Sequence, residues 1–243
     1  MLFRSPLCEA RVNHWAHKGD RNCDPWWENE TDWHRSWKDK FPTEWQEVVH
    51  FDESGEKHIA DVKTESGCAL EFQHSYLDPE ERRSRNAFYS KLVWVVNGAR
   101  RQTDRSQFQR KLEESTNVID GLLIKRVHFP EECRLLKEWN DSNALVFFDF
   151  QEATDTEQSD FWFLLPKVSS SDTYLSPFSR DKFIELHNSS KFDESIQNII
   201  SLFHKELARK ELIQYVNSKH SRPNGLPGFE RYMANIRRRR GRF

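Results

Sequence analysis

The sequence has few cysteines, no long apolar run and no apolar leader. Its four cysteines, Cys8, Cys23, Cys68 and Cys133, have no spacing typical of a disulfide framework. No stretch approaches the length of a membrane span, and the residues after Met1 contain no apolar segment of the secretory type. These features exclude a disulfide-rich secreted domain and a membrane protein, and they predict a cytoplasmic protein.

Apolar residues are also scarce, at 36% of the chain, whereas charged residues reach 31%. That balance alone is typical of disordered chains. Nine Trp and 18 Phe residues argue against disorder, because aromatic side chains supply much buried area per residue. A chain of 243 residues is long enough for a sizeable core, so we expect a folded protein with a very polar surface.

The formal net charge of −2 hides an uneven distribution of charge. From Lys219 to Phe243 the single acidic residue is Glu230, and the last positions form an arginine-rich arm that contains Arg237, Arg238, Arg239, Arg240 and Arg242. A basic arm on a near-neutral chain predicts a polyanionic partner, with nucleic acid as the first candidate. A solvated arm without a specific partner is the alternative.

The stretch from His58 to Ser75 predicts a β-hairpin. The connection 65–67 ends in glycine, which suits the left-handed position of a three-residue loop. Counting back from that loop places Asp61 directly opposite Glu71. Like charges at facing positions of an antiparallel pair repel each other, so a raised carboxyl pKa or a bound hard cation such as Mg²⁺ is expected to offset the repulsion.

Alternation along the two strands separates polar from apolar side chains. The predicted polar face carries Asp61, Lys63, Glu71 and Gln73. The predicted apolar face carries Ala60, Val62, Cys68, Leu70 and Phe72. The hairpin is therefore expected to present its polar groups together and to pack its other side on a core.

A helix is predicted directly before the strands. Asp24 and Pro25 form an N-cap and first-turn pair, and Pro42 disfavours helix at the preceding residue, so the helix should end near Lys40. Residues spaced by four form a polar stripe on it: Glu30, His34 and Lys38. A neighbouring apolar stripe consists of Trp26, Trp33 and Trp37. Such a polar stripe is most often a solvated face, but this helix could lean over the hairpin and bring the stripe to the carboxylates.

The remaining pattern extends this α/β core. The run from Leu92 to Val96 is apolar throughout, as in a strand buried on both faces. Asp78 and Pro79 predict a helix start, with Glu81 completing a capping box and a helix end near Lys91. Further strands are expected over 44–51, 121–129, 144–150 and 160–168, and helices over 103–114 and 191–218. The aromatic residues between 117 and 185 suggest a second packed layer, which the segment 183–187 closes.

The first residues contain a possible metal site. Two cysteines and two histidines lie within sixteen positions: Cys8, His14, His17 and Cys23. Such a set could bind Zn²⁺ in a closed tetrahedral site. The spacing is not one of the common zinc-finger patterns, so packed or hydrogen-bonded side chains remain the alternative.

Asp61 followed by Glu71, Phe72 and Gln73 has the form of the divalent-metal site in the PD-(D/E)XK nuclease superfamily. The sequence motifs around these residues are more specific. It comprises HWAH at 14–17, DPWWE at 24–28, the spaced residues 30, 34 and 38, WQEVVH at 45–50, HIADV at 58–62, EFQHS at 71–75, PEE at 79–81 and WVV at 94–96. Together these motifs resemble the CoiA-like bacterial family, whose members are linked to competence and are predicted to carry a restriction-endonuclease-like nuclease domain.

The resemblance covers about residues 8–100 strongly and the rest loosely. It implies a mixed sheet flanked by helices in a nuclease-like core over 25–116, after a Cys/His segment at 1–24. A β-rich extension over 117–187 and a C-terminal helix with the basic arm over 188–243 would follow.

The resemblance also implies a divalent-metal-dependent nuclease that hydrolyses phosphodiesters with Mg²⁺ or Mn²⁺. Glu30, Asp61 and Glu71 would be the acidic metal-site residues, His34 would accompany them, and Gln73 stands where the superfamily usually has lysine. Gln73 cannot act as a general base, so its role would be to position water or ligate the metal. Lys38 or Lys63 could supply the missing cation, and the hairpin geometry favours Lys38.

Two other interpretations of the same residues stay open. In one, the chain is a catalytically inactive nucleic-acid-binding protein with a remnant site. In the other, it is a nuclease directed at RNA or used in defence. DNA is the favoured substrate and no membrane is expected, but the sequence does not determine strand preference or oligomeric state.

Overall fold

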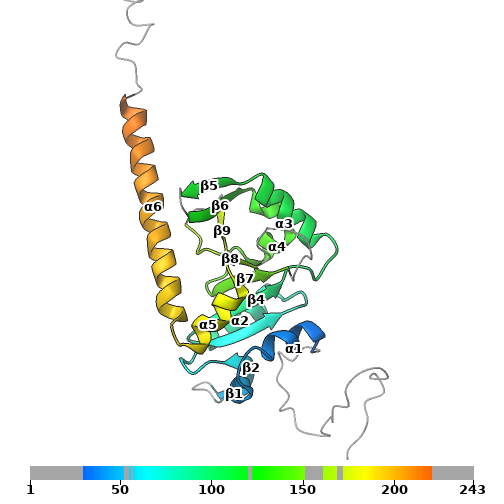
Figure 1. Ribbon diagram of the computed structural model, residues 1–243. Coiled ribbons are helices and arrows are strands. Elements are labelled where there is room, and N and C mark those ends of the chain that lie inside the picture. The colour runs from blue at the N-terminus through cyan, green and yellow to red at the C-terminus, as the bar shows by residue number, and fades with distance from the viewer. Residues whose placement is uncertain are drawn as a thin grey trace, which may run out of the picture.

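The computed structural model describes residues 30–51, 55, 57–119, 122–150, 161–168 and 172–220. Within these ranges nine strands form one mixed sheet in the order β1-β2-β3-β4-β7-β8-β9-β6-β5, with helices on both faces (Figure 1). The predicted α/β class with a mixed sheet is therefore confirmed. The possible zinc residues, Cys8, His14, His17 and Cys23, and the arginine arm at 237–242 lie outside the described residues.

Runs of one to three strands are separated by helices, and two helices end the described chain. The helices are α1 Asp32–Lys38, α2 Pro79–Phe88, α3 Asp104–Glu113, α4 Arg134–Trp139, α5 Arg180–Asn188 and α6 Phe192–His220, with short 3-10 turns η1 Thr43–Trp45 and η2 Pro130–Glu132. The strands are β1 Gln46–Phe51, β2 Lys57–Lys63, β3 Ala69–Gln73, β4 Leu92–Asn97, β5 Thr116–Ile119, β6 Leu122–His128, β7 Leu145–Asp149, β8 Phe161–Leu164 and β9 Asp172–Pro177.

Helix α1 begins later than predicted. Its N-cap is Thr31, whose hydroxyl accepts a hydrogen bond from the His34 amide while the His34 ring contacts the Thr31 amide. This capping box satisfies two backbone donors at the helix start, so α1 does not begin at Asp24 as predicted, and Asp24 itself lies outside the described residues. Glu30 consequently precedes the helix and is not part of its polar stripe.

Helix α2 begins where the sequence indicated. The Asp78 carboxylate accepts a hydrogen bond from the Glu80 amide at 2.8 Å, and Pro79 occupies the first helical position. The predicted capping box is wrong, because the Glu81 carboxylate lies 2.5 Å from the Arg85 guanidinium one turn later. The helix ends at Phe88, somewhat before the expected Lys91.

The β2–β3 hairpin has the predicted register. Val62 pairs with Leu70 and Lys63 pairs with Ala69, and the loop glycine, Gly67, has φ of 80° as a left-handed loop position requires. The same count places Asp61 opposite Glu71. The paired residues end at Val62, so the predicted facing of the two carboxylates stays a prediction.

The centre of the sheet is parallel. Strand β4 pairs in parallel with β3 on one side and β7 on the other, and all six of its residues are buried. The prediction of a strand buried on both faces at 92–96 is confirmed. The carboxyl ends of β3, β4 and β7 therefore meet at one edge of the sheet, where open α/β sheets commonly bind ligands.

The strands between 117 and 187 continue this sheet and do not form a second layer. The predicted strand at 160–168 is shorter, at Phe161–Leu164, and 183–187 lies in helix α5. Strands β5 and β9 and helix α4 had not been predicted. Strand β5 has four residues, β9 contains Asp, Ser and Pro, which favour turns, and α4 has six residues, so their local patterns are weak.

Two apolar cores lie on the two faces of the sheet. One packs α1, α5 and α6 against the sheet through Trp33, Trp37, Phe72, Phe147, Phe183, Phe192 and Phe203. The other packs α3 and α4 against the opposite face through Trp94, Phe108, Phe148, Leu135 and Trp139. The many aromatic residues that argued against disorder are thus mainly core residues.

Gly98 follows β4 at a position where the backbone approaches an aromatic ring. A Cβ atom at this position would lie 2.6 Å from Cδ1 and 2.7 Å from Cζ of Phe150, whose ring packs on Phe108. We expect Gly98→Ala to lower the free energy of unfolding by about 1–3 kcal/mol, because the core must shift to admit the methyl group. Chemical denaturation measures this change.

Ala99→Ser is the matched control, since it adds one heavy atom at the exposed neighbouring residue. Equal midpoints for the two variants in a denaturant titration would contradict the close packing at Gly98.

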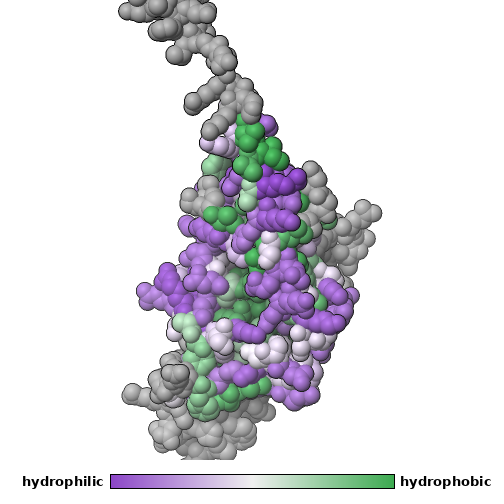
Figure 2. Space-filling view, turned by 90° about the vertical axis from the view of Figure 1, so that its left-hand side faces the viewer, coloured by the Kyte–Doolittle hydropathy of each residue, from purple (hydrophilic) through white to green (hydrophobic). Residues whose placement is uncertain are grey.

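Helix α6 extends beyond the sheet along its β5 side (Figure 1). Its first half is anchored by Ile196, Ile200, Phe203 and Leu207, which are buried in the core. Large side chains are exposed toward its end, namely Leu212, Ile213, Tyr215 and Val216. Figure 2 shows hydrophobic surface in this part of the molecule. Among the described residues, no helix combines the length and apolar character needed to cross a membrane.

Candidate functional site

Asp61 lies where strand β2 departs from β3. Its Oδ2 atom accepts a hydrogen bond from the Phe72 amide at 2.8 Å, so the side chain occupies the place of a backbone acceptor. The regular pairing of β2 with β3 ends at Val62. A carboxylate that takes over a backbone hydrogen bond opens the hairpin at this point and fixes its own orientation.

The opening of the hairpin corrects the predicted alternation. Ala60 belongs to the core that contains Trp94, whereas Val62 belongs to the core that contains Trp33, so these two residues do not share a face. The chain changes its orientation relative to the sheet at Asp61, between them. The predicted single apolar face behind the polar groups is therefore wrong at Ala60.

Lys38 is surrounded by carboxylates. Its Nζ atom lies 2.7 Å from Glu30 Oε1, 3.0 Å from Glu47 Oε1 and 3.8 Å from Asp61 Oδ1, and its side chain is 8% exposed. The prediction that Lys38 approaches the acids is supported by these distances. Lys63 lies elsewhere, with Nζ 3.5 Å from His50 Nδ1. Lys38 is thus the lysine placed to neutralise charge beside Asp61.

Glu47 is a member of this cluster that sequence reasoning missed. The pairs Gln46 with Val62 and Val48 with Ala60 place Glu47 opposite Asp61 on the other side of β2. Glu47 has φ of 53°, a left-handed conformation that costs a non-glycine residue on the order of 1 kcal/mol or more. The sequence contained a signal for it, because Glu47 is the one acidic residue among the alternating apolar positions of the strand predicted over 44–51, Trp45, Val49 and Phe51.

The site changes the protonation of its members. Burial raises the pKa of Asp61, and the Phe72 amide and the Lys38 charge offset this effect only in part. Burial acts against the charged ammonium of Lys38, but its contacts with Glu30, Asp61 and Glu47 raise its pKa, so it stays a cation. Burial likewise opposes ionisation of Glu30, yet Lys38 keeps the pKa of that carboxyl low. The cluster therefore holds the positive charge of Lys38 beside the Asp61 carboxylate, whose ionised form burial disfavours.

Glu71 is buried on the α2 side of the strand pair. Its Oε2 atom lies 3.2 Å from Arg85 NH1, and Arg85 also pairs with Glu81. The Arg85 guanidinium lies 5.8 Å from the centre of the Trp94 ring. Arg85 thus neutralises Glu71 from α2, a contact between residues 14 positions apart that no local pattern indicated.

Gln73 ends strand β3 and is 1% exposed. Its Nε2 atom donates to the backbone oxygen and to the hydroxyl of Ser75, both at 3.3 Å. The same Ser75 carbonyl accepts a hydrogen bond from Arg100 NH1 at 2.6 Å. Gln73 therefore shares an acceptor with an arginine, which follows β4 and had not been predicted.

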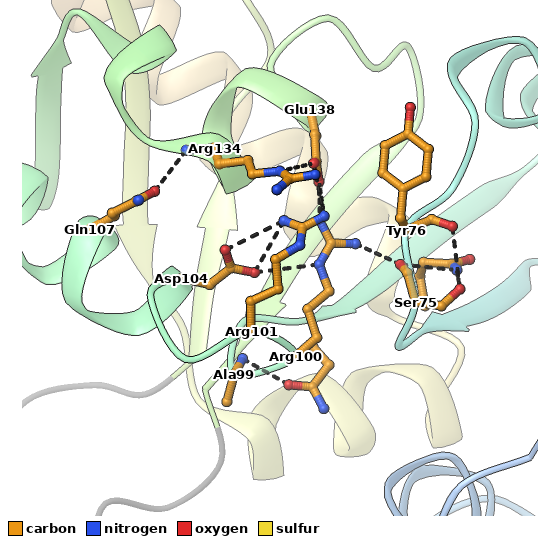
Figure 3. Close-up of polar contacts among 11 residues, drawn as sticks. Ser75, Tyr76, Ala99, Arg100, Arg101, Asp104, Gln107, Arg134 and Glu138 are labelled. Carbon is orange, nitrogen blue, oxygen red and sulfur yellow. Dashed lines mark hydrogen bonds and ion pairs between the residues drawn. The ribbon is translucent and has the colours of Figure 1, made fainter.

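Arg100 belongs to a layer of arginines at this edge of the sheet (Figure 3). Arg100, Arg101 and Arg134 all contact the Glu138 carboxylate of α4, and Arg100 and Arg101 also contact Asp104 of α3. The Arg100 side chain is 3% exposed and that of Arg134 is 60% exposed. The layer connects the carboxyl ends of β3 and β4 to α3 and α4.

His34 lies close to the other predicted site residues, but its ring already interacts with Thr31. Its Nδ1 atom lies 2.9 Å from the Thr31 hydroxyl, its ring is 6.0 Å from that of His74, and the residue is 5% exposed. His34 therefore lies beside the site mainly as the cap of α1.

The acids of the site are paired with side-chain cations and are not grouped around a vacant centre. Within the described ranges, no set of three or more His, Cys, Asp or Glu residues has an arrangement that could hold a metal ion. Asp61 Oδ1, however, is hydrogen-bonded by no described residue, and the Asp61 side chain is 25% exposed. A partly buried carboxylate oxygen of this kind fits a hard cation, for which carboxylates are preferred ligands.

A separate cavity of about 490 Å³ lies at the opposite edge of the sheet, where β4 and β7 begin. Its lining includes Cys68, and the Lys91–Asp193 ion pair lies in its wall. Burial raises the pKa of Cys68 to about 12, so the thiol is protonated and unreactive at neutral pH. This cavity is not part of the site around Asp61.

Comparison with known proteins adds no relative. No protein-family model, curated protein or solved structure matches the chain. The resemblance to the CoiA-like family stays a prediction from the motifs.

Proposed function

We propose that the chain is a divalent-metal-dependent phosphodiester hydrolase with a restriction-endonuclease-like core of the CoiA-like type, acting on DNA in the cytoplasm. The observation that carries the proposal is Asp61, which combines an orientation fixed by the Phe72 amide with an oxygen that no described residue hydrogen-bonds. Glu71 lies on the neighbouring strand β3, where it pairs with Arg85, and Lys38 holds a positive charge 3.8 Å from Asp61. Two carboxylates and a cation at one end of a hairpin suit the hydrolysis of an anionic ester.

Asp61 and Glu71 would hold Mg²⁺ or Mn²⁺, and Glu30 would contribute if Lys38 released it. Such a metal activates water and stabilises the charge that develops on the phosphate. The chain's own residues have other tasks. Lys38 neutralises a phosphate oxygen, Gln73 orients the attacking water by hydrogen bonding, and Arg85 pairs with the buried Glu71 carboxylate. The water oxygen bonds to phosphorus as the ester bond to the leaving oxygen breaks, and one proton of that water passes to the leaving oxygen.

The hydrolase is tested by cleavage assays on single-stranded, duplex and branched DNA and on RNA, with Mg²⁺, Mn²⁺ or a chelator. Asp61→Asn and Glu71→Gln should each lower the cleavage rate at least about 100-fold, because metal-assisted stabilisation contributes several kcal/mol. Glu65→Gln, at an exposed loop position of the same hairpin, should cleave like the wild type. Cleavage that persists in Asp61→Asn would remove Asp61 from the mechanism.

A nucleic-acid-binding protein without catalysis is the second candidate. The observation in its favour is that Lys38 and Arg85 already neutralise Glu30 and Glu71. Titration with Mn²⁺, followed by calorimetry, separates the two candidates. A hydrolase binds the metal and loses that binding in Asp61→Asn, whereas the non-catalytic protein shows no metal binding beyond that of the variant.

A further inference from the structure

Tyr76 is an exposed aromatic residue that borders the candidate site. It lies three residues after Gln73 and is 54% exposed, while the next residue, Leu77, is buried. The segment before it is fixed, because the Ser75 carbonyl accepts hydrogen bonds from Gln73 and Arg100. Figure 3 shows the Tyr76 ring extending from this segment with its hydroxyl outermost. The ring is therefore presented on a rigid support, and no described residue hydrogen-bonds its hydroxyl.

The arginine layer supplies positive charge at the same edge. Three guanidinium groups, those of Arg100, Arg101 and Arg134, share the two carboxylates of Asp104 and Glu138. One positive charge therefore remains within the cluster. Arg100 is buried, Arg101 is 22% exposed and Arg134 is 60% exposed, so the outer members can reach an anionic ligand without losing their support from Glu138.

We propose that Tyr76 and the outer arginines form a subsite for an unpaired nucleotide, with a base stacked on the Tyr76 ring and its phosphate held by Arg101 and Arg134. The proposal rests on the proposed action on nucleic acid and deepens it, because it names a strand with unpaired bases as the substrate class. A base within a duplex is stacked on its neighbours, whereas an unpaired base is free to stack on a protein ring.

Binding without divalent metal tests the subsite apart from cleavage. Single-stranded DNA, single-stranded RNA of the same sequence and the corresponding DNA duplex are titrated in the presence of a chelator, with anisotropy as the readout. Tyr76→Ala should weaken single-strand binding about tenfold, since base–aromatic stacking contributes about 1–3 kcal/mol per base. Tyr76→Phe should bind like the wild type. Tyr215→Ala is the matched control, at a tyrosine on α6 that is 56% exposed.

The arginines are tested through the salt dependence of the same binding. Arg134→Gln should reduce the slope of log affinity against log salt by roughly one unit, as expected for the loss of one phosphate contact. Arg209→Gln, at a side chain of α6 that is 62% exposed, should leave the slope unchanged. Equal slopes for the wild type and Arg134→Gln would overturn the assigned phosphate contact.

Three results would overturn the stacking subsite: no single-strand binding by the wild type, equal affinities of Tyr76→Ala and Tyr215→Ala, or an equal loss on duplex DNA. The comparison of DNA with RNA identifies the sugar, since the strand that shows the larger Tyr76 effect is the one the subsite fits. Cleavage by the wild type with Mg²⁺ is measured separately. A Tyr76 effect without cleavage refutes the hydrolase and keeps the subsite, whereas cleavage without a Tyr76 effect refutes the subsite alone.

Discussion

Asp149→Ala should lower the free energy of unfolding by about 4 kcal/mol or more. The buried Asp149 carboxylate accepts hydrogen bonds from the indole nitrogens of Trp33 and Trp37, each at 2.9 Å, and from Arg180 at 2.8 and 2.6 Å. Removing one partner of a buried ion pair costs about 3–5 kcal/mol, and the two indole N–H groups would lose their acceptor as well. Urea denaturation followed by tryptophan fluorescence measures the change.

Asp149→Asn should fall between the wild type and Asp149→Ala, because the amide keeps one acceptor oxygen but loses the charge. Asp181→Ala, at the exposed aspartate next to Arg180, is the control and should change stability by about 0.5 kcal/mol. A stability loss for Asp149→Ala no larger than that of the control would show that Asp149 does not anchor α1.

Acid should destabilise the protein through His187. This residue is 1% exposed, and its ring stacks on Phe192 at 3.8 Å and packs against Phe183 and Phe41. Burial lowers the pKa of His187 from 6.5 to about 3. Above pH 6.5 both folded and unfolded chains carry the neutral ring. Below it the unfolded chain binds a proton that the folded chain excludes, so stability falls as the pH drops toward about 3.

The contribution of His187 should reach about 1.4 kcal/mol per pH unit inside that window, or about 2 kcal/mol between about pH 6.5 and pH 5. His187→Phe should remove this part of the pH dependence, because phenylalanine has no titrating group. Free energies of unfolding at several pH values, compared between the variant and the wild type, isolate the contribution. The exposed His204→Gln variant should keep the wild-type slope, and an unchanged slope in His187→Phe would refute the assignment.

Local signals in the sequence were sufficient for the hairpin and for parts of the core. The loop glycine set the hairpin register at Val62 and Lys63, because turn length fixes pairing. The apolar run of β4 identified the buried central strand. Both features depend on residues a few positions apart, so the chain's local chemistry determines them.

Features that depend on distant contacts were not predictable. Glu47 reaches Lys38 through a strained conformation of β1, Arg85 reaches Glu71 from α2, and Arg100 reaches Ser75 across 25 positions. The start of α1 was misplaced because Asp24 and Pro25 form a local start signal, whereas the observed cap is Thr31 with His34. The preference for Lys38 over Lys63 was correct. It followed from the helical spacing of Lys38 and from the position of Lys63 near the hairpin loop.

The anchor of α1 has a consequence for the order in which the site can form during synthesis. Asp149 is translated 112 residues after Trp37. At the usual rate of about 5–20 residues per second, roughly 5–25 seconds pass between them. Until β7 has emerged, α1 lacks the acceptor for its two indoles, and Lys38 has no fixed position beside Asp61. A nascent chain would therefore not carry an assembled site, and the complete site would appear only when more than half of the protein had been made.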